Sequence, residues 1–120
     1  MRGLNKVTLI GNLGSNPEIK VLDGTIKVAK FSLATTEIYR NKDGNMQSET
    51  EWHNVVAWRN LADLTDKYLQ KGSHIYLEGK LKTRCYEDRD GKKKYVTEII
   101  AESFIMLDKG ADKAEINASF

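Results

Sequence analysis

Apolar and polar residues alternate along most of this 120-residue chain, and this two-residue period is the feature that most restricts its fold. Such alternation is typical of β-strands, in which successive side chains point to opposite faces. It occurs in residues 5–13, 26–39, 50–58, 73–87 and 94–102. The segment 26–39 is long for a strand, so we expect strong curvature or a β-bulge within it. The chain is therefore predicted to consist mainly of strands.

One segment has a helical period instead. Asn60 resembles a helix N-cap, and Gly72 stands where helices commonly stop. Between them, apolar residues recur at the three- and four-residue spacing of a helix: Leu61, Leu64, Tyr68 and Leu69. A single helix is therefore predicted between the third and fourth strands.

Polar and turn-forming sequences separate the strands. Pro17, the only proline, interrupts hydrogen-bond ladders, so residues 18–22 are expected to be irregular. Residues 40–48 predict a long hairpin loop, and residues 104–107 predict a short apolar segment after the fifth strand. Asp-Gly pairs predict hairpin turns at residues 23–24, 43–44 and 90–91.

Five curved antiparallel strands with one helix between the third and fourth are the layout of an OB-fold barrel. The predicted fold class is therefore all-β, with one OB-fold domain over residues 1–108 and a short tail over residues 109–120. No run approaches the roughly 20 apolar residues that span a bilayer, and residues 1–6 lack the apolar stretch of a secretory signal. We expect a cytoplasmic, nucleoid-associated protein.

The residues that catalysis and metal binding require are not grouped in this sequence. It has no glycine-rich phosphate loop, no paired-cysteine motif and no His-Glu-x-x-His motif. The single cysteine, Cys85, and the two histidines, His53 and His74, are too scattered for a zinc site. We therefore expect no enzymatic activity, no metal and no cofactor, and we expect His53 to be buried or at an interface.

The segment 50–58 contains both tryptophans of the chain. As a strand, it places four side chains on one face: Trp52, Asn54, Val56 and Trp58. The two indoles then lie roughly 20 Å apart, a distance that fits two separate stacking positions on one extended ligand. Tyr39, at the end of the segment 26–39, is a further stacking candidate, whereas Phe31 alternates with core residues.

Residues 80–94 are locally basic, although the whole chain carries a net charge of only +2. Seven basic residues stand against three acidic ones there, an excess of four positive charges. Alternation assigns four side chains to the outward face: Lys80, Lys82, Arg84 and Tyr86. Leu81 falls on the opposite, inner face. Aromatic rings interleaved with cations predict sequence-tolerant nucleic-acid binding, and a solvated hairpin tip is the alternative for the charges alone.

The first strand carries apolar side chains on both faces. Val7, Leu9 and Ile10 are more apolar surface than one small barrel buries, so we expect Val7 and Leu9 at an oligomer interface. The alternative is simply a well-filled barrel.

Five motifs occur in a fixed order: NKVTLIGNLG at residues 5–14, NPE at 16–18, TEWH at 50–53, KGS at 71–73 and YLEGKL at 76–81. Together they resemble the bacterial single-stranded DNA-binding protein family over residues 1 to about 108. The resemblance implies an OB fold, a homotetramer built from two dimers, and wrapping of single-stranded DNA during replication, recombination and repair.

The resemblance also implies roles for single residues. The family's stacking aromatics would fall on Tyr39, Trp52, Trp58 and Tyr86. Contacts with the DNA backbone would fall on Arg2, Lys71 and Arg84. His53 matches a family position at the subunit interface.

The end of the chain departs from the family pattern. Members usually end in a long linker and an acidic tip, Asp-Ile-Pro-Phe, which recruits replication and repair proteins. Residues 108–120 are short, mixed in charge and without proline, although they end in Phe120. Recruitment of such partners by the standard tip is therefore not expected, and a shortened, plasmid, phage or accessory member is an open interpretation.

The sequence favours a non-catalytic protein that binds and protects single-stranded DNA. An OB-fold adaptor, such as a primosomal protein, is a second hypothesis, which weak binding of poly-dT by a dimer would favour. A nuclease is a third, which labelled DNA left intact with magnesium would exclude.

Overall fold

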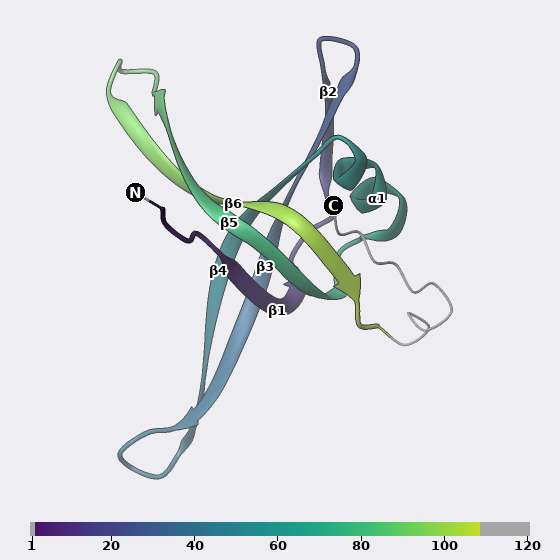
Figure 1. Ribbon diagram of the computed structural model, residues 1–120. Coiled ribbons are helices and arrows are strands. Elements are labelled where there is room, and N and C mark those ends of the chain that lie inside the picture. The colour runs from purple at the N-terminus through teal and green to yellow at the C-terminus, as the bar shows by residue number, and fades with distance from the viewer. Residues whose placement is uncertain (1, 109–120) are drawn as a thin grey trace.

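The computed structural model describes residues 2–108, and in it five strands close into a barrel (Figure 1). The sheet order is β1-β5-β6-β4-β3, and a further pairing of β1 with β3 closes the ring. The barrel strands are β1 (Val7–Leu13), β3 (Ile26–Arg40), β4 (Met46–Trp58), β5 (His74–Glu87) and β6 (Lys93–Met106). The helix α1 (Asn60–Tyr68) lies between the third and fourth of them, so the predicted OB-fold barrel is confirmed.

Two pairings differ from the sequence prediction. Residues 18–22 are not irregular, because they form the strand β2 (Glu18–Leu22), which pairs antiparallel with the start of β3. Pro17 directly precedes this strand, where its missing N–H removes no bond from the ladder. The barrel is also not wholly antiparallel, since β4 and β6 run parallel where Val55 and Val56 pair with Ile99 and Ile100.

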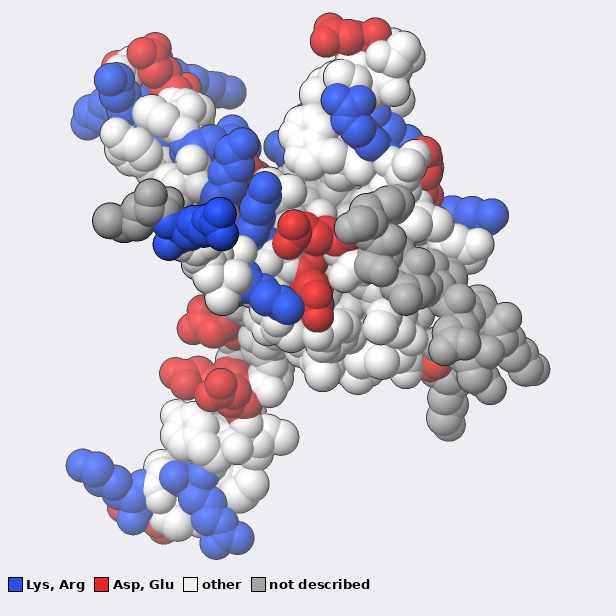
Figure 2. Space-filling view, in the orientation of Figure 1, with Lys and Arg blue, Asp and Glu red and all other residues white. Residues whose placement is uncertain are grey.

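Three hairpins extend beyond the barrel as arms, formed by β2–β3, β3–β4 and β5–β6 (Figure 1). The predicted loop 40–48 is shorter than expected, because Asn41 closes a tight turn by accepting the N–H groups of Asp43 and Asn45, each at 3.0 Å. Residues 104–107 are likewise mostly the end of β6 and not a separate segment. Figure 2 shows Lys and Arg side chains gathered on the β5–β6 arm, and Asp and Glu side chains on the stem of the β3–β4 arm.

The expected bulge lies in a different strand. The β3–β4 ladder runs without a register shift from Val28 opposite Trp58 to Arg40 opposite Met46. The shift occurs where β5 pairs with β6: Glu78 lies opposite Ser103 but Gly79 lies opposite Ala101, so the extra residue is Glu102 of β6. A Cβ at Gly79 would overlap the backbone carbonyl of Ile100, so only glycine allows this close approach of the two strands.

The core fills the barrel, and α1 covers it. Fully buried side chains from four strands form its centre, among them Leu33, Val55, Ile75, Leu77 and Phe104. The helix adds Leu61, Ala62 and Thr65 to the buried set. Asn60 is the first helical residue, so the predicted cap is wrong: the N-cap is Arg59, which makes no side-chain cap bond. Within residues 2–108, no helix is long and apolar enough to cross a membrane.

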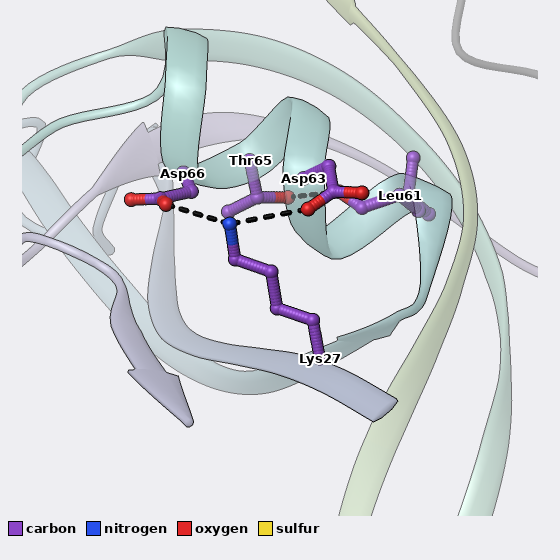
Figure 3. A network of polar contacts seen from close by, with 5 residues as sticks. All are labelled: Lys27, Leu61, Asp63, Thr65 and Asp66. Carbon is purple, nitrogen blue, oxygen red and sulfur yellow. Dashed lines mark hydrogen bonds and ion pairs between the residues drawn. The ribbon is translucent and has the colours of Figure 1, made fainter. Parts of the chain in front are cut away.

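An ion-pair cluster ties α1 to the barrel (Figure 3). Lys27 of β3 extends its ammonium group between two helix carboxylates, 3.1 Å from Asp63 and 2.8 Å from Asp66. These hydrogen bonds raise the pKa of Lys27 above its ordinary value, chiefly through Asp66. Within the helix, the Thr65 hydroxyl donates to the Leu61 carbonyl at 2.8 Å.

Candidate nucleic-acid interface

A groove lies between the β2–β3 and β5–β6 arms, which stand apart in Figures 1 and 2. It consists of two hollows, of about 530 Å³ and about 390 Å³. The two hollows are continuous, because they share four lining residues: Lys30, Val56, Arg84 and Glu98. Cations from three strands line the larger one: Lys20, Lys30, Lys80, Lys82 and Arg84. This groove is therefore predominantly basic, with an apolar floor.

The register of β3 against β4 places the two tryptophans. Trp58 lies opposite Val28, and Trp52 lies opposite Ala34, so both tryptophans are on one face of the hairpin, as the alternation predicts. On the other face, Val55 enters the core. Trp58 lines the groove and is 41% exposed, whereas Trp52 is 61% exposed. Both rings therefore present flat apolar surface to solvent.

Gly14 fixes one side of the Trp52 ring. A Cβ at this position would overlap the indole, so the ring packs directly against the glycine backbone. The Gly14 N–H donates to the Ser32 carbonyl at 3.0 Å, which holds that backbone against β3. The ring is nevertheless largely exposed.

The basic side chains that follow Gly79 in β5 line the groove. Lys80 lies opposite Ile100 and Lys82 lies opposite Glu98, and all four side chains line the larger hollow. Leu81 is 49% exposed, so its predicted inward placement is wrong. The physical reason is that β5 leaves the barrel soon after the bulge and continues as an arm with solvent on both faces.

Arg84 is held by a carboxylate and lies near an aromatic ring. Its Nε donates to Oε1 of Glu98 at 2.9 Å, and its Nη2 donates to Oε2 at 3.5 Å. Glu98 raises the pKa of Arg84 above its already high value through these bonds. The guanidinium carbon lies 5.9 Å from the centre of the Tyr86 ring, which is 47% exposed. Arg84 and Tyr86 therefore form one cation–aromatic unit on the arm.

Five of the sequence-predicted site residues do not line this groove: Tyr39, Trp52, Tyr86, Arg2 and Lys71. Tyr39 lies opposite Gln47, which puts it on the face of the β3–β4 arm turned away from Trp52. Lys71 is exposed, and its backbone N–H donates to Asn16 at one end of the groove, at 2.8 Å. Arg2 is exposed near the start of the chain.

The predicted interface residues lie at different depths. Val7 and Leu9 pack against the core, so the outward apolar residue of β1 is Ile10, which is 55% exposed. His53 is half-buried, and its Nε2 hydrogen-bonds the Thr35 hydroxyl at 2.9 Å.

Sequence reasoning missed Lys20, Lys30 and Glu98 as groove residues. Lys30 could have been found, because a turn centred on residues 43–44 pairs β3 with β4 and sets Lys30 opposite Val56. Lys20 was missed with β2. No sequence feature indicated Glu98, because an acidic residue is not expected in an interface that binds phosphates. Among residues 2–108, no group of three or more His, Cys, Asp and Glu side chains is arranged to hold a metal.

The model of the single-strand binding protein family matches residues 4–107. The chain belongs to this family. It is 49% identical to single-stranded DNA-binding protein 1 of Chlorobaculum tepidum over 88% of this chain and 66% of the relative. It is 44% identical to a single-stranded DNA-binding protein of Xylella fastidiosa over 92% of this chain and 68% of the relative. The chain thus spans about two thirds of the length of these two relatives.

A solved structure of this family has the same fold. The Plasmodium falciparum SSB complex with ssDNA superposes with a TM-score of 0.82 at 43% sequence identity, covering 90% of this chain and 98% of that chain. These matches confirm the family resemblance inferred from the five motifs. The atypical tail, residues 109–120, lies outside the described residues.

Proposed function

We propose that this protein binds and protects single-stranded DNA without reading its sequence, in replication, recombination and repair, and that it acts by binding and not by catalysis. One observation carries the proposal: exposed tryptophan faces and a row of cations share one side of the barrel. Bases stacked on aromatic rings contribute roughly 1–3 kcal/mol each and need no sequence match. Lysine and arginine neutralise the phosphates between them.

The roles we assign follow the position of each side chain. Trp58 stacks a base in the groove, while Lys30, Lys80 and Lys82 neutralise phosphates beside it. Trp52 stacks a second base farther along β4. On the β5–β6 arm, Tyr86 stacks a base and Arg84 binds a phosphate. Tyr39, on the far face of the β3–β4 arm, is reached only by a strand that passes around that arm, which agrees with wrapping. Arg2 and Lys71 serve as outlying backbone contacts.

We further propose a homotetramer of two dimers in the cytoplasm, associated with the nucleoid. The outward apolar surface that supports a subunit contact is formed by Ile10 of β1, Tyr76 of β5 and Ile105 of β6, which lie opposite one another across the sheet. His53 contributes to the second contact. Replication and repair proteins are partners only if residues other than the standard acidic tip recruit them.

The test is a fluorescence titration with poly-dT at low and high salt. We expect strong tryptophan quenching that duplex DNA of equal length does not compete away. The apparent affinity should fall steeply with salt, with a slope of about −0.7 per phosphate neutralised. We expect Trp58→Ala and Trp52→Ala each to weaken binding by about tenfold, given the stacking energies above.

Two results would contradict the proposal. If both variants bound as the parent does, the stacking assignment would be wrong. If the parent showed no quenching at all, an adaptor with its tryptophans in a protein interface would replace this proposal. Labelled single-stranded DNA should remain intact after incubation with magnesium, which excludes a nuclease.

A further inference from the structure

Two acidic residues line the basic groove, Glu18 and Glu98, and only Glu98 is buried. Glu98 is only 8% exposed and lines both hollows, and it lies opposite Lys82 on the neighbouring strand. A carboxylate at this point repels the phosphates that the surrounding cations attract. Simple charge complementarity therefore does not explain its presence.

The contacts of Glu98 suggest a different purpose. Its two oxygens accept hydrogen bonds from Nε and Nη2 of Arg84, along one edge of the planar guanidinium. Arginine has five N–H donors, so both donors of Nη1 and one of Nη2 stay directed away from the carboxylate. The Arg84 side chain is still 49% exposed, and its guanidinium carbon lies 5.9 Å from the centre of the Tyr86 ring. The guanidinium is thus fixed on one edge and open on the next.

Holding Arg84 in this way reduces the cost of binding. An unrestrained arginine on an exposed arm loses much rotamer freedom when it grips a phosphate. A side chain that is already oriented loses less, and the matching geometry of guanidinium and phosphate is kept.

We propose that Glu98 is a positioning residue for nucleotide binding: it holds Arg84 beside Tyr86, so that a phosphate and the adjoining base meet one preorganised subsite. The inference rests on the proposed function and extends it, because it assigns a favourable role to an acidic residue in a polyanion groove.

A purely electrostatic effect and a positioning role predict opposite changes in DNA affinity for Glu98→Gln. This change keeps the shape of the side chain and removes one negative charge, so electrostatics alone predicts tighter binding. If Glu98 positions Arg84, the neutral amide holds the guanidinium less firmly, and we expect binding of a dT oligomer to weaken by about threefold to tenfold.

Glu18→Gln is the matched control. Glu18 lines the same groove and loses the same charge, but it is exposed and pairs with Lys20 at 3.4 Å on its own strand. It should leave affinity unchanged or slightly tighter. If Glu98→Gln tightened binding as Glu18→Gln does, the inference would be overturned, while the parent's own binding would still support the proposed function. If the parent bound no single-stranded DNA, the proposed function would fail and this inference with it.

Two further variants separate positioning from a general loss of structure. Arg84→Lys keeps the charge on an exposed side chain but cannot form the two-point contact, so it should weaken binding about as much as Glu98→Gln. In the Arg84→Gln background, Glu98→Gln should cause no further weakening, because the group it positions is gone. Full additivity of the two losses, or parental affinity in Arg84→Lys, would contradict the proposal. Melting temperatures of all variants identify any that fold poorly.

Discussion

At the scale of single residues, the Trp52 ring depends on a neighbour that has no side chain. The indole rests on the backbone of Gly14, and Ser32 holds that backbone in place. A stacking surface contributes most when it is already oriented, because the ring then loses little freedom on binding. Glycine is therefore required at position 14 because a larger side chain would overlap the Trp52 ring, and not because the backbone must be flexible there.

Gly14→Ala should displace the Trp52 ring and weaken poly-dT binding several-fold, up to about tenfold, because a stacked base contributes roughly 1–3 kcal/mol. The tryptophan emission of the unbound protein should shift as well. Fluorescence titration and emission spectra measure both effects. Gly3→Ala is the control, since a Cβ there meets no atom within 4 Å. Equal affinity and emission in the two variants would show that Gly14 does not orient the ring.

The residues that the sequence predicted best are those whose facing depends on one strand alone. Trp52 and Trp58 share a face because they are six positions apart, an even number that a period of two preserves. The position of Tyr39 depends on which residue of β4 it pairs with, and local alternation does not contain that information. Glu98 lies in the groove because β5 and β6 pair across a bulge, which is likewise a long-range property.

At the scale of elements, the helix and the five barrel strands follow from periodicity, whereas three features do not. The parallel β4–β6 contact arises only when the barrel closes. The strand β2 is not predicted because Pro17 indicates an interruption of the ladder, although a proline just before a strand removes no hydrogen bond from it. The bulge opposite Gly79 depends on how β5 pairs with β6, and the exposure of Leu81 depends on where β5 leaves the barrel, so neither follows from local alternation.

The attachment of α1 predicts a measurable pH dependence. The pKa of Lys27 is higher in the folded protein than its ordinary value of 10.5, because Asp66 and Asp63 stabilise the charged form. Its contribution to stability is therefore fully present below the unfolded pKa and is lost as the pH rises through the folded pKa.

Lys27→Met should lower the melting temperature at pH 7 by a few degrees at most, since exposed ion pairs contribute little. The difference between parent and variant should shrink as the pH is raised above the ordinary lysine pKa. Thermal melts followed by circular dichroism at a series of pH values measure this. Lys42→Met, at an exposed position in the β3–β4 turn, is the control. A difference that stays constant or grows with pH would mean that the cluster in Figure 3 does not act through the lysine charge.

At the scale of the whole molecule, the described chain leaves much apolar and backbone surface uncovered. Both faces of the β3–β4 arm are exposed, as the adjacent residues Ile38 and Tyr39 illustrate. In the barrel, only Asn12 and Leu13 of β1 pair with β3. The rest of the β1 edge on that side is not covered by β3. Isolated two-stranded ribbons are only marginally stable in water, and open strand edges pair readily with other chains. We therefore expect DNA or a second copy of the chain to cover these surfaces.

The apolar strip Ile10–Tyr76–Ile105 predicts which surface joins the subunits. It crosses three neighbouring strands on the outside of the barrel, and Ile10 and Ile105 are 55% and 38% exposed. A self-complementary contact buries this strip twice, so one substitution removes two apolar side chains from it. Light scattering should give about four times the 13.6 kDa chain mass for the parent and a smaller species for Ile10→Asp. Ile38→Asp places the same charge on an exposed isoleucine of the β3–β4 arm and should leave the mass unchanged. If Ile10→Asp kept the parental mass, the subunit contact would lie elsewhere on the molecule.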